Sequence, residues 1–179
     1  MNLADCTEPR LILPRLNTRD APGIIQELSQ AMQQAGRIVD LLRFYHTALN
    51  RELMVSSEVE SGVAFPHGRA AEIAEVVFAM GRTEAPVAWG SNLVPAVRLV
   101  FLVGVPEGDA GQFLTVACAL SHLARNASLM DQLLRSSEVG EILSILRSMP
   151  VREAAACASS LGLQGTHRGV SSLRRPDSV

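Results

Sequence analysis

Apolar residues recur at helical spacing in two stretches of the first third of the chain. The first stretch starts at Asp20-Ala-Pro22, ends at Gly36, and carries apolar residues at Ile24, Ile25, Leu28 and Met32. The second starts near Val39, with an apolar stripe at Leu41, Leu42, Tyr45, Leu49 and Leu53. A period of three to four residues indicates amphipathic helices, with proline favoured in the first turn and glycine at the end. Before them, residues 2–8 predict a short helical segment, and residues 11–13, between two prolines, an edge strand.

Two β-rich runs follow in the middle of the chain. Residues 76–80 and 97–103 are rich in valine, phenylalanine and leucine, and the second run is apolar at nearly every position. A run without alternation is typical of a strand buried on both faces, so residues 97–103 predict a central strand. Between the two runs, residues 82–96 contain Pro86, Gly90, Asn92 and Pro95, which indicates a loop or a short strand around Trp89. We expect Trp89, the only tryptophan, to pack in the core.

The pattern becomes helical again in the second half. Residues 112–126, 129–136 and 139–149 each predict an amphipathic helix. Strands interleaved with helices predict an α/β fold, a three-layer-like sandwich with a small mixed sheet flanked by helices. We expect residues 1–150 to form this domain, residues 151–162 an accessory C-terminal helix, and residues 163–179, which are rich in Gly, Ser and Arg, a flexible tail.

Composition narrows the function classes. The 179 residues suffice for one domain, 47% are hydrophobic and the formal net charge is −2, so no strong field predicts binding to nucleic acid or to an anionic membrane. We find neither a signal peptide nor an apolar run of membrane-spanning length, and therefore expect no membrane insertion. The three cysteines, Cys6, Cys118 and Cys157, form no C-x-x-C pair, which predicts reduced thiols and a cytoplasmic protein.

The candidate chemistry lies in the run Gly62-Val-Ala-Phe-Pro-His67-Gly-Arg69. Proline fixes its own φ and holds Phe65 extended, so we expect the chain to leave a strand and turn sharply at His67. Gly62 and Gly68 allow close backbone approach to a ligand, and Gly68 allows a positive φ after the histidine. An imidazole on such a turn, with little side-chain cover, is available as a neutral nucleophile near pH 7. A surface histidine in a Gly/Pro turn is the alternative interpretation of this run.

The surrounding segments separate these interpretations. They are Arg51-Glu52, Ser56-Ser-Glu-Val-Glu-Ser-Gly-Val-Ala-Phe-Pro-His67, Pro86-Val-Ala-Trp89 and Val97-Arg-Leu-Val-Phe-Leu-Val-Gly-Val-Pro106. In this order they resemble the fructose/mannitol-type enzyme IIA domain of the bacterial phosphoenolpyruvate-dependent phosphotransferase system, its nitrogen-regulatory branch included. The resemblance covers about residues 3–148, and the G-V-A-[IF]-P-H core is its most specific part.

The resemblance implies a role for each matching residue. His67 would accept a phosphoryl group from the histidine-containing phosphocarrier protein. It would then pass the group to a sugar permease domain, or keep it as a mark that regulates the binding of this protein to a regulated protein. Arg51 would stabilise the phosphate, because a planar guanidinium engages two phosphate oxygens together. Ser57 would neighbour the phosphate where many members have threonine, with backbone N–H groups near Gly62 and Gly68 as further donors. Glu52 would orient Arg51, and Arg69 would face the partner.

This chain departs from the family pattern at three positions. Gln112 stands where the family commonly carries a second histidine beside the phosphohistidine, and Glu58 and Glu60 stand where glycines are usual. His122 is a poor substitute, because ten residues along a helix is about 15 Å. Three functions therefore remain open: an active phosphocarrier with a phosphohistidine intermediate, a regulatory binding module switched by phosphorylation, and a scaffold that is not phosphorylated. We expect no cofactor: the scattered histidines and cysteines lack metal-ligand spacing, and no Walker-type loop is found.

Overall fold

Strand β6 (Asn92–Pro106) is the centre of a mixed six-stranded sheet. The computed structural model describes residues 1–59, 61–90, 92–108 and 110–151. The sheet order is β1-β5-β6-β3-β2, and β4 also pairs with β6, beyond the end of β3. Here β1 is Ile12–Leu13, β2 Glu58–Val59, β3 Val63–Ala64, β4 His67–Ala70 and β5 Val77–Trp89. β5 runs antiparallel to β6, whereas β3 and β4 run parallel to it. The expected edge strand and central strand are both confirmed.

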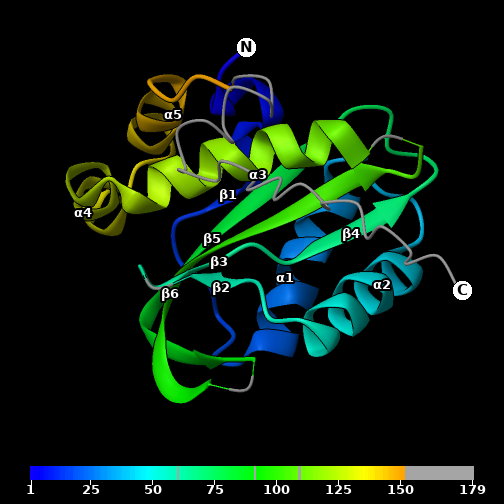
Figure 1. The fold of residues 1–179 in the computed structure, drawn as a ribbon, viewed down its shortest axis with the longest axis horizontal. Helices are drawn as coiled ribbons and strands as arrows, with labels where there is room; N and C mark the ends of the chain where they lie inside the picture. Colours follow the sequence, from blue (N-terminus) through cyan, green and yellow to red (C-terminus); the bar gives the residue numbers. More distant parts are fainter. Residues whose placement is uncertain (60, 91, 109, 152–179) are drawn as a thin grey trace, which may run out of the picture.

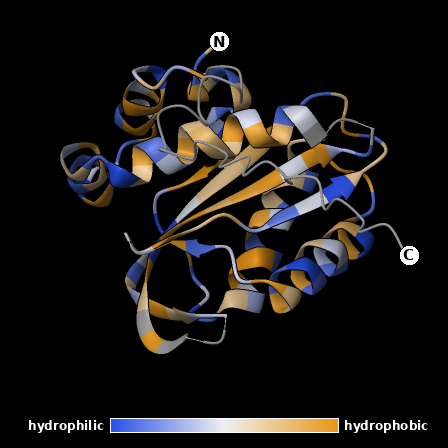
Figure 2. Ribbon diagram, in the orientation of Figure 1, coloured by the Kyte–Doolittle hydropathy of each residue, from blue (hydrophilic) through white to orange (hydrophobic). Residues whose placement is uncertain are grey.

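Helices cover both faces of this sheet, as Figure 1 shows. On one face lie α3 (Ala110–Arg125), α4 (Ala127–Arg135), α5 (Val139–Arg147) and the 3-10 helix Leu3–Cys6, packed on Phe101, Val103 and Val105 of β6. On the other lie α1 (Ala21–Gln34), α2 (Leu41–Met54) and the 3-10 turn Pro9–Leu11, with Val100 and Leu102 beneath them. The apolar strands form the middle layer in Figure 2. The predicted α/β sandwich is thus confirmed.

The first two helices start where the sequence predicts. Asp20 and Asp40 cap them, because their carboxylates accept hydrogen bonds from the N–H of Gly23 (2.7 Å) and of Arg43 (3.0 Å). Helix α2 bears out its expected apolar stripe only in part, with Leu41, Tyr45 and Leu49 half-buried against the core. Its fully packed residues are Phe44, Ala48 and Glu52, while Leu42 and Leu53 are 63% and 72% exposed. The helix turns this face to the sheet because Gly68 of β4 leaves room for the Phe44 ring.

For residues 82–96 the sequence predicts a loop or a short strand around Trp89, and the structure shows strand, longer than expected. β5 continues to Trp89 and β6 begins at Asn92, so the segment forms a long hairpin with irregular pairing between Arg82 and Trp89. The pairing of β5 with β6 shifts register twice, which accommodates the turn-forming residues within the hairpin. Arg82 pairs with Leu99, Val87 with Val97 and Trp89 with Asn92. Gly90, at φ +58°, turns the chain at the end of β5. The buried side chains of Val87 and Trp89 hold this half of the hairpin on the domain.

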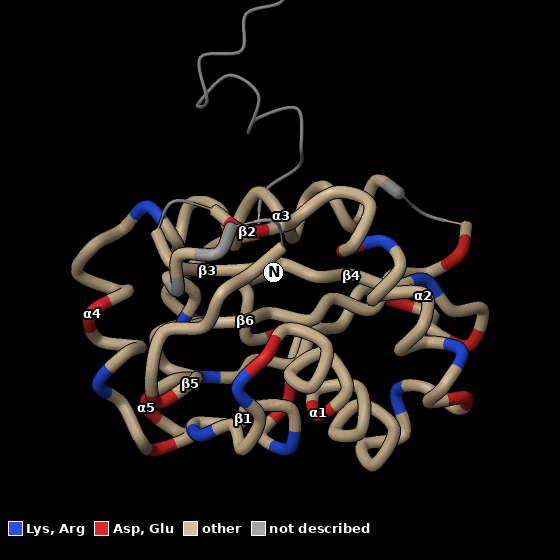
Figure 3. Tube along the Cα trace, turned by 90° about the horizontal axis from the view of Figure 1, so that it is seen from below, with Lys and Arg blue, Asp and Glu red and all other residues tan. Residues whose placement is uncertain are grey.

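Charged residues lie mainly on helices and loops, and most of the sheet is uncharged (Figure 3). No helix in the described ranges is long and apolar enough to cross a membrane, and no three His, Cys, Asp or Glu side chains there could hold a metal ion. Cys6 is a free, buried thiol, and burial raises its pKa to about 11. Cys118 lies on α3, and Cys157 lies outside the described residues. The expected accessory helix and flexible tail lie outside the described residues, apart from Val151.

Candidate functional site

His67 is the first residue of β4 and lies opposite Val103 of β6. The expected sharp turn is absent: β3 pairs with β6 at Leu99 and Val100, and β4 resumes the same parallel pairing at Val103. Pro66 has no N–H to donate, but its carbonyl accepts a 2.8 Å hydrogen bond from the Val103 N–H. The ladder therefore continues past the proline, and His67 sits on a strand, which holds it more rigidly than a turn would.

The His67 ring is half-buried against helix α3. It stacks on Phe113, with ring centroids 4.3 Å apart and planes 29° from parallel. The Nδ1 atom of His67 is buried and has no hydrogen-bond partner among the described residues. The expectation of little side-chain cover is thus wrong: an aromatic ring from the first turns of α3 covers the imidazole. The sequence contained a signal for this contact, because Phe113 begins the apolar repeat of the predicted helix.

Burial and charge together lower the pKa of His67. Burial is the largest cause, since it disfavours the imidazolium, and the positive charges of Arg51 and Arg69 act in the same direction. The nearby Phe65 carbonyl and Glu52 carboxylate favour the imidazolium and so oppose part of this lowering of the pKa. The buried Nδ1 nevertheless has no hydrogen-bond partner among the described residues. The net pKa lies below 6.5, so His67 is neutral at pH 7.

Two arginines lie near His67 with their charges uncompensated. Arg51 is in the last turn of α2, and Arg69 is two residues along β4, on the same side of the strand as His67. Both side chains are exposed. Neither forms an ion pair with any carboxylate in the described part of the chain. The structure thus brings together the three residues to which the resemblance assigns the phosphate and its partner.

Glu52, the neighbour of Arg51, is the buried centre of a polar network. Its carboxylate accepts hydrogen bonds from the Trp89 indole N–H (2.7 Å), the Ser57 N–H (2.7 Å) and the Ser57 hydroxyl (2.6 Å). These contacts replace the expected role of orienting Arg51. Trp89 was expected only to pack in the core, so sequence reasoning missed its link to the site, although the resemblance already contains both residues.

Ser57 connects this network to the strand that carries His67. Its hydroxyl donates its proton to Glu52 and accepts a 3.1 Å hydrogen bond from the Phe65 N–H. The Ser57 carbonyl also accepts from that N–H, at 3.3 Å. Because the single hydroxyl proton is engaged, Ser57 positions residues 65–67 and is not free to donate to a phosphate.

Neither glycine has the geometry expected of a phosphate donor. Gly62 has φ +74° and lies opposite the Arg98 region of β6, about 16 Å along the strand from His67. Its N–H donates to the Val59 carbonyl in a turn. Gly68 does not have a positive φ; it is glycine because a Cβ there would lie 2.9 Å from the Phe44 ring. The close approach that Gly68 permits is therefore to α2.

Gln112 and Glu58 also lie differently from the expectation. The Gln112 amide oxygen accepts a hydrogen bond from the Val76 N–H (3.2 Å), and the α3 residue placed against His67 is its neighbour, Phe113. Glu58 lines a separate cavity of about 900 Å³ with Ser121 and Arg125, near the C-terminal end of α3. Ser121 is about 12 Å along the helix from Phe113. His122 is an exposed helix residue.

The chain matches one sequence family over residues 6–149, described as the phosphoenolpyruvate-dependent sugar phosphotransferase system, EIIA 2. A nitrogen regulatory protein of Bradyrhizobium diazoefficiens is 28% identical over 155 residues, which are 86% of this chain and 100% of that protein. A fructose-specific EIIABC component of Bacillus subtilis is 25% identical over 146 residues, 82% of this chain but only 23% of that protein.

Solved structures agree with these matches. The nitrogen regulatory protein IIA-Ntr from Neisseria meningitidis superposes with a TM-score of 0.70 at 25% identity, over 80% of this chain and 97% of that one. The IIA mannitol structure from Escherichia coli gives a TM-score of 0.67 at 17% identity, over 78% and 97%, which shows a shared fold.

Proposed function

We propose, for a chain that belongs to the EIIA 2 family of the phosphoenolpyruvate-dependent sugar phosphotransferase system, that His67 accepts a phosphoryl group from the histidine-containing phosphocarrier protein. It then passes the group to a sugar permease domain or holds it as a regulatory mark. The observation that carries the proposal is that His67, half-buried and neutral at pH 7, lies near two arginines that form no ion pair with a carboxylate of the described chain.

The burial of Nδ1 selects the reacting nitrogen. A phosphoryl donor cannot approach this atom in line, so Nε2 is the nucleophile and the proton resides on Nδ1. The Nε2 lone pair forms the new P–N bond as the donor's P–N bond breaks, and that bonding pair returns to the donor imidazole. Stacking on Phe113 fixes the ring plane and hence the direction of attack.

Arg51 and Arg69 supply the electrostatic stabilisation. Phosphoryl transfer spreads negative charge over three equatorial oxygens, and a guanidinium can engage two of them at once. The same two charges lower the pKa of His67, so they keep its lone pair available before the phosphoryl group arrives. The first turn of α3, close to His67 through Phe113, adds the positive end of a helix dipole.

The surroundings of the site suit a protein partner. Leu53 and Met54 of α2 and Leu114 of α3 are exposed apolar residues on the two helices that carry Arg51 and Phe113. Exposed apolar residues near a reactive group are typical of a protein-binding surface. Because the phosphocarrier acts in the cytoplasm, we place this chain there. Similarity to nitrogen regulatory proteins in sequence and in structure favours the regulatory use of the phosphoryl group.

Phosphorylation by the reconstituted system tests this proposal. The protein is mixed with phosphoenolpyruvate, the first enzyme of the system and the phosphocarrier, and its mass and phosphorylated peptide are determined. We expect one phosphoryl group on His67, labile to acid and stable to base, and none on a His67→Gln variant. His122→Gln, a change on the exposed face of α3, is the matched control and should label normally. An acid-stable phosphate on Ser56 or Ser57, or normal labelling of His67→Gln, would refute the proposal.

A scaffold that is never phosphorylated is the second candidate. The observation that favours it is that Gln112 stands where the family commonly has a second histidine. The Gln112 amide oxygen accepts a hydrogen bond from the Val76 N–H, and an amide cannot carry a proton at neutral pH. Absence of any label under conditions in which the phosphocarrier itself is fully phosphorylated would establish this alternative.

A further inference from the structure

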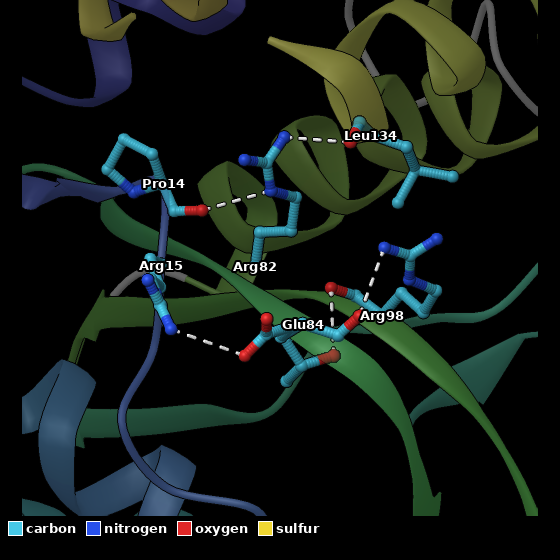
Figure 4. Close-up of a pocket in the computed structure, with 7 residues that line it drawn as sticks. Pro14, Arg15, Arg82, Glu84, Arg98 and Leu134 are labelled. Atoms are coloured by element: carbon cyan, nitrogen blue, oxygen red, sulfur yellow. Dashed lines mark hydrogen bonds and ion pairs between the residues drawn. The ribbon is translucent and has the colours of Figure 1, made fainter. Parts of the chain in front are cut away.

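A polar cavity lies on the β5–β6 hairpin, away from His67. It has a volume of about 230 Å³ and lies between the segment after β1, the β5–β6 hairpin and the C-terminal end of α4. Figure 4 shows its lining residues, Pro14, Arg15, Arg82, Thr83, Glu84, Arg98 and Leu134. Arg82 pairs with Leu99 of β6, four residues from the Val103 that pairs with His67, which is about 13 Å along the strand. We call it the arginine pocket.

Arg82 is fixed in this pocket by backbone carbonyls. Its Nε donates to the Pro14 carbonyl (2.9 Å), and one terminal nitrogen donates to the carbonyls of Leu133 (3.2 Å), Leu134 (2.8 Å) and Ser136 (2.6 Å). The last three belong to the end of α4, whose final carbonyls lack helical partners. Arg82 thus offsets the negative end of that helix, and no carboxylate in the described chain pairs with its charge.

Arg98 is the less satisfied of the two arginines. Its Nε is buried and lacks a hydrogen-bond partner in the described part of the molecule. Within the described residues its guanidinium makes one hydrogen bond, from a terminal nitrogen to the Glu84 carbonyl, which is long at 3.4 Å. A buried N–H of a charged group without a partner carries a substantial desolvation cost. Both guanidinium groups rise from adjacent strands on the same side of the hairpin (Figure 4).

The charges around the pocket leave it positive. The lining holds three arginines and one carboxylate, that of Glu84. Glu84 pairs with Arg15 at 3.4 Å, but both side chains are more than 70% exposed, so this pair contributes little. Burial, followed by the nearby charge of Arg98, lowers the pKa of Arg82. The two guanidinium groups therefore repel each other in a partly desolvated space, where the one carboxylate, that of Glu84, is paired with Arg15 instead.

We propose that the arginine pocket binds a small oxyanion, with Arg98 as its principal ligand and Arg82 as a fixed second charge. The cavity is smaller than the roughly 300–1,000 Å³ of ordinary small-molecule sites, so it fits a single phosphate or carboxylate group. Such a group accepts hydrogen bonds from the terminal nitrogens of Arg98, only one of which holds a long contact to the Glu84 carbonyl, and neutralises the repulsion between the two arginines. Phosphate binds more tightly than a monocarboxylate, because it carries more charge and more acceptor oxygens.

Arginine side-chain NMR provides a direct test. Inorganic phosphate is titrated into the ¹⁵N-labelled protein at constant ionic strength, with acetate and with sodium chloride in parallel titrations. We expect saturable shifts of the Arg98 and Arg82 Nε–Hε signals with phosphate, weaker ones with acetate, and none with chloride. The titration is repeated in the His67→Gln variant, which lacks the proposed phosphoryl acceptor. The Arg98 and Arg82 signals should shift as in the wild type, which separates the pocket from the His67 site.

Variants of the pocket complete the test. Arg98→Gln should weaken phosphate binding about tenfold or more, since it removes a charge-assisted hydrogen bond and a positive charge. Arg135→Gln, which removes an arginine exposed on α4, should leave the affinity unchanged. If Arg98→Gln does not fold, Arg98→Lys keeps the charge without the planar fork and should also weaken binding. Linear shifts equal to those with chloride, or saturable shifts confined to Arg51 and Arg69, would overturn the proposal and indicate an adventitious ion only.

Discussion

The Trp89 indole donates a 2.7 Å hydrogen bond to the Glu52 carboxylate, although 37 positions separate the two residues. The bond joins the tip of β5 to the last turn of α2, next to Arg51. The same carboxylate holds Ser57, whose hydroxyl accepts the Phe65 N–H two residues before His67. One buried acid therefore aligns the helix that carries Arg51 with the strand that carries His67.

Glu52→Gln should destabilise the protein by about 1.5–3 kcal/mol, the range for hydrogen bonds to a charged group. The amide replaces one acceptor oxygen with an N–H₂ group, which leaves one of the three donors without an acceptor. Urea unfolding measures the change, and fluorescence reports it locally because Trp89 is the only tryptophan. Glu84→Gln, in an exposed ion pair, is the control and should cost less than about 1 kcal/mol. Equal stabilities for Glu52→Gln and the wild type would show the network to be incidental.

Arg51→Lys should slow phosphorylation of His67 far more than it weakens binding of the phosphocarrier. Lysine keeps the charge but loses the planar fork, so the loss appears in the transition state. A decrease of about tenfold or more in the single-turnover rate is expected, with an unchanged unfolding midpoint because Arg51 is exposed and unpaired within the described chain. Arg43→Lys, at an exposed position on the same helix, is the matched control. An equal rate for Arg51→Lys and the wild type would contradict a role in transfer.

The lowered pKa of His67 predicts a pH dependence of stability. When the pH drops below the unfolded pKa of about 6.5, the imidazole takes up a proton in the unfolded chain but not yet in the folded protein. The free energy of unfolding therefore decreases as the pH decreases. The loss ends once the pH passes below the folded pKa, where both states are protonated. NMR titration of the imidazole should give a folded pKa under 6.5, and Phe113→Ala should raise it by exposing the ring. A value at or above 6.5 in the wild type would contradict the burial of this histidine.

Gly68→Ala should destabilise the fold by about 1–3 kcal/mol, because the new methyl group would lie 2.9 Å from Cε2 of Phe44 and 3.3 Å from Cβ of Ala48. Phe44→Leu should recover part of the loss by vacating that space. Gly140→Ala serves as the control, since nothing lies within 4 Å of its Cβ position and it is in helix α5. It should stabilise the protein by about 0.5–1 kcal/mol. A Gly68→Ala variant as stable as the wild type would show that α2 moves freely relative to β4.

Local sequence patterns were enough to predict most of the helices and the central strand. Helical periodicity located α1, α3, α4 and α5, and the nearly continuous apolar run over residues 97–103 identified β6, because such patterns depend only on which positions avoid water. The motif around His67 and the Arg51-Glu52 pair indicated the family and the candidate site, since the spacing of those residue types along the chain carries that information.

The construction of the site depends on contacts between segments that are distant in the sequence. The hairpin extends through turn-forming residues because burial of Val87 and Trp89 outweighs local propensity. Glu52 is buried because donors from Trp89 and Ser57 satisfy it, and no local pattern predicts a partner 37 residues away. His67 is covered because α3 crosses the sheet where its own Phe113 meets the ring. Periodicity reports which face of an element is apolar, whereas the partner of a polar group depends on how distant segments pack.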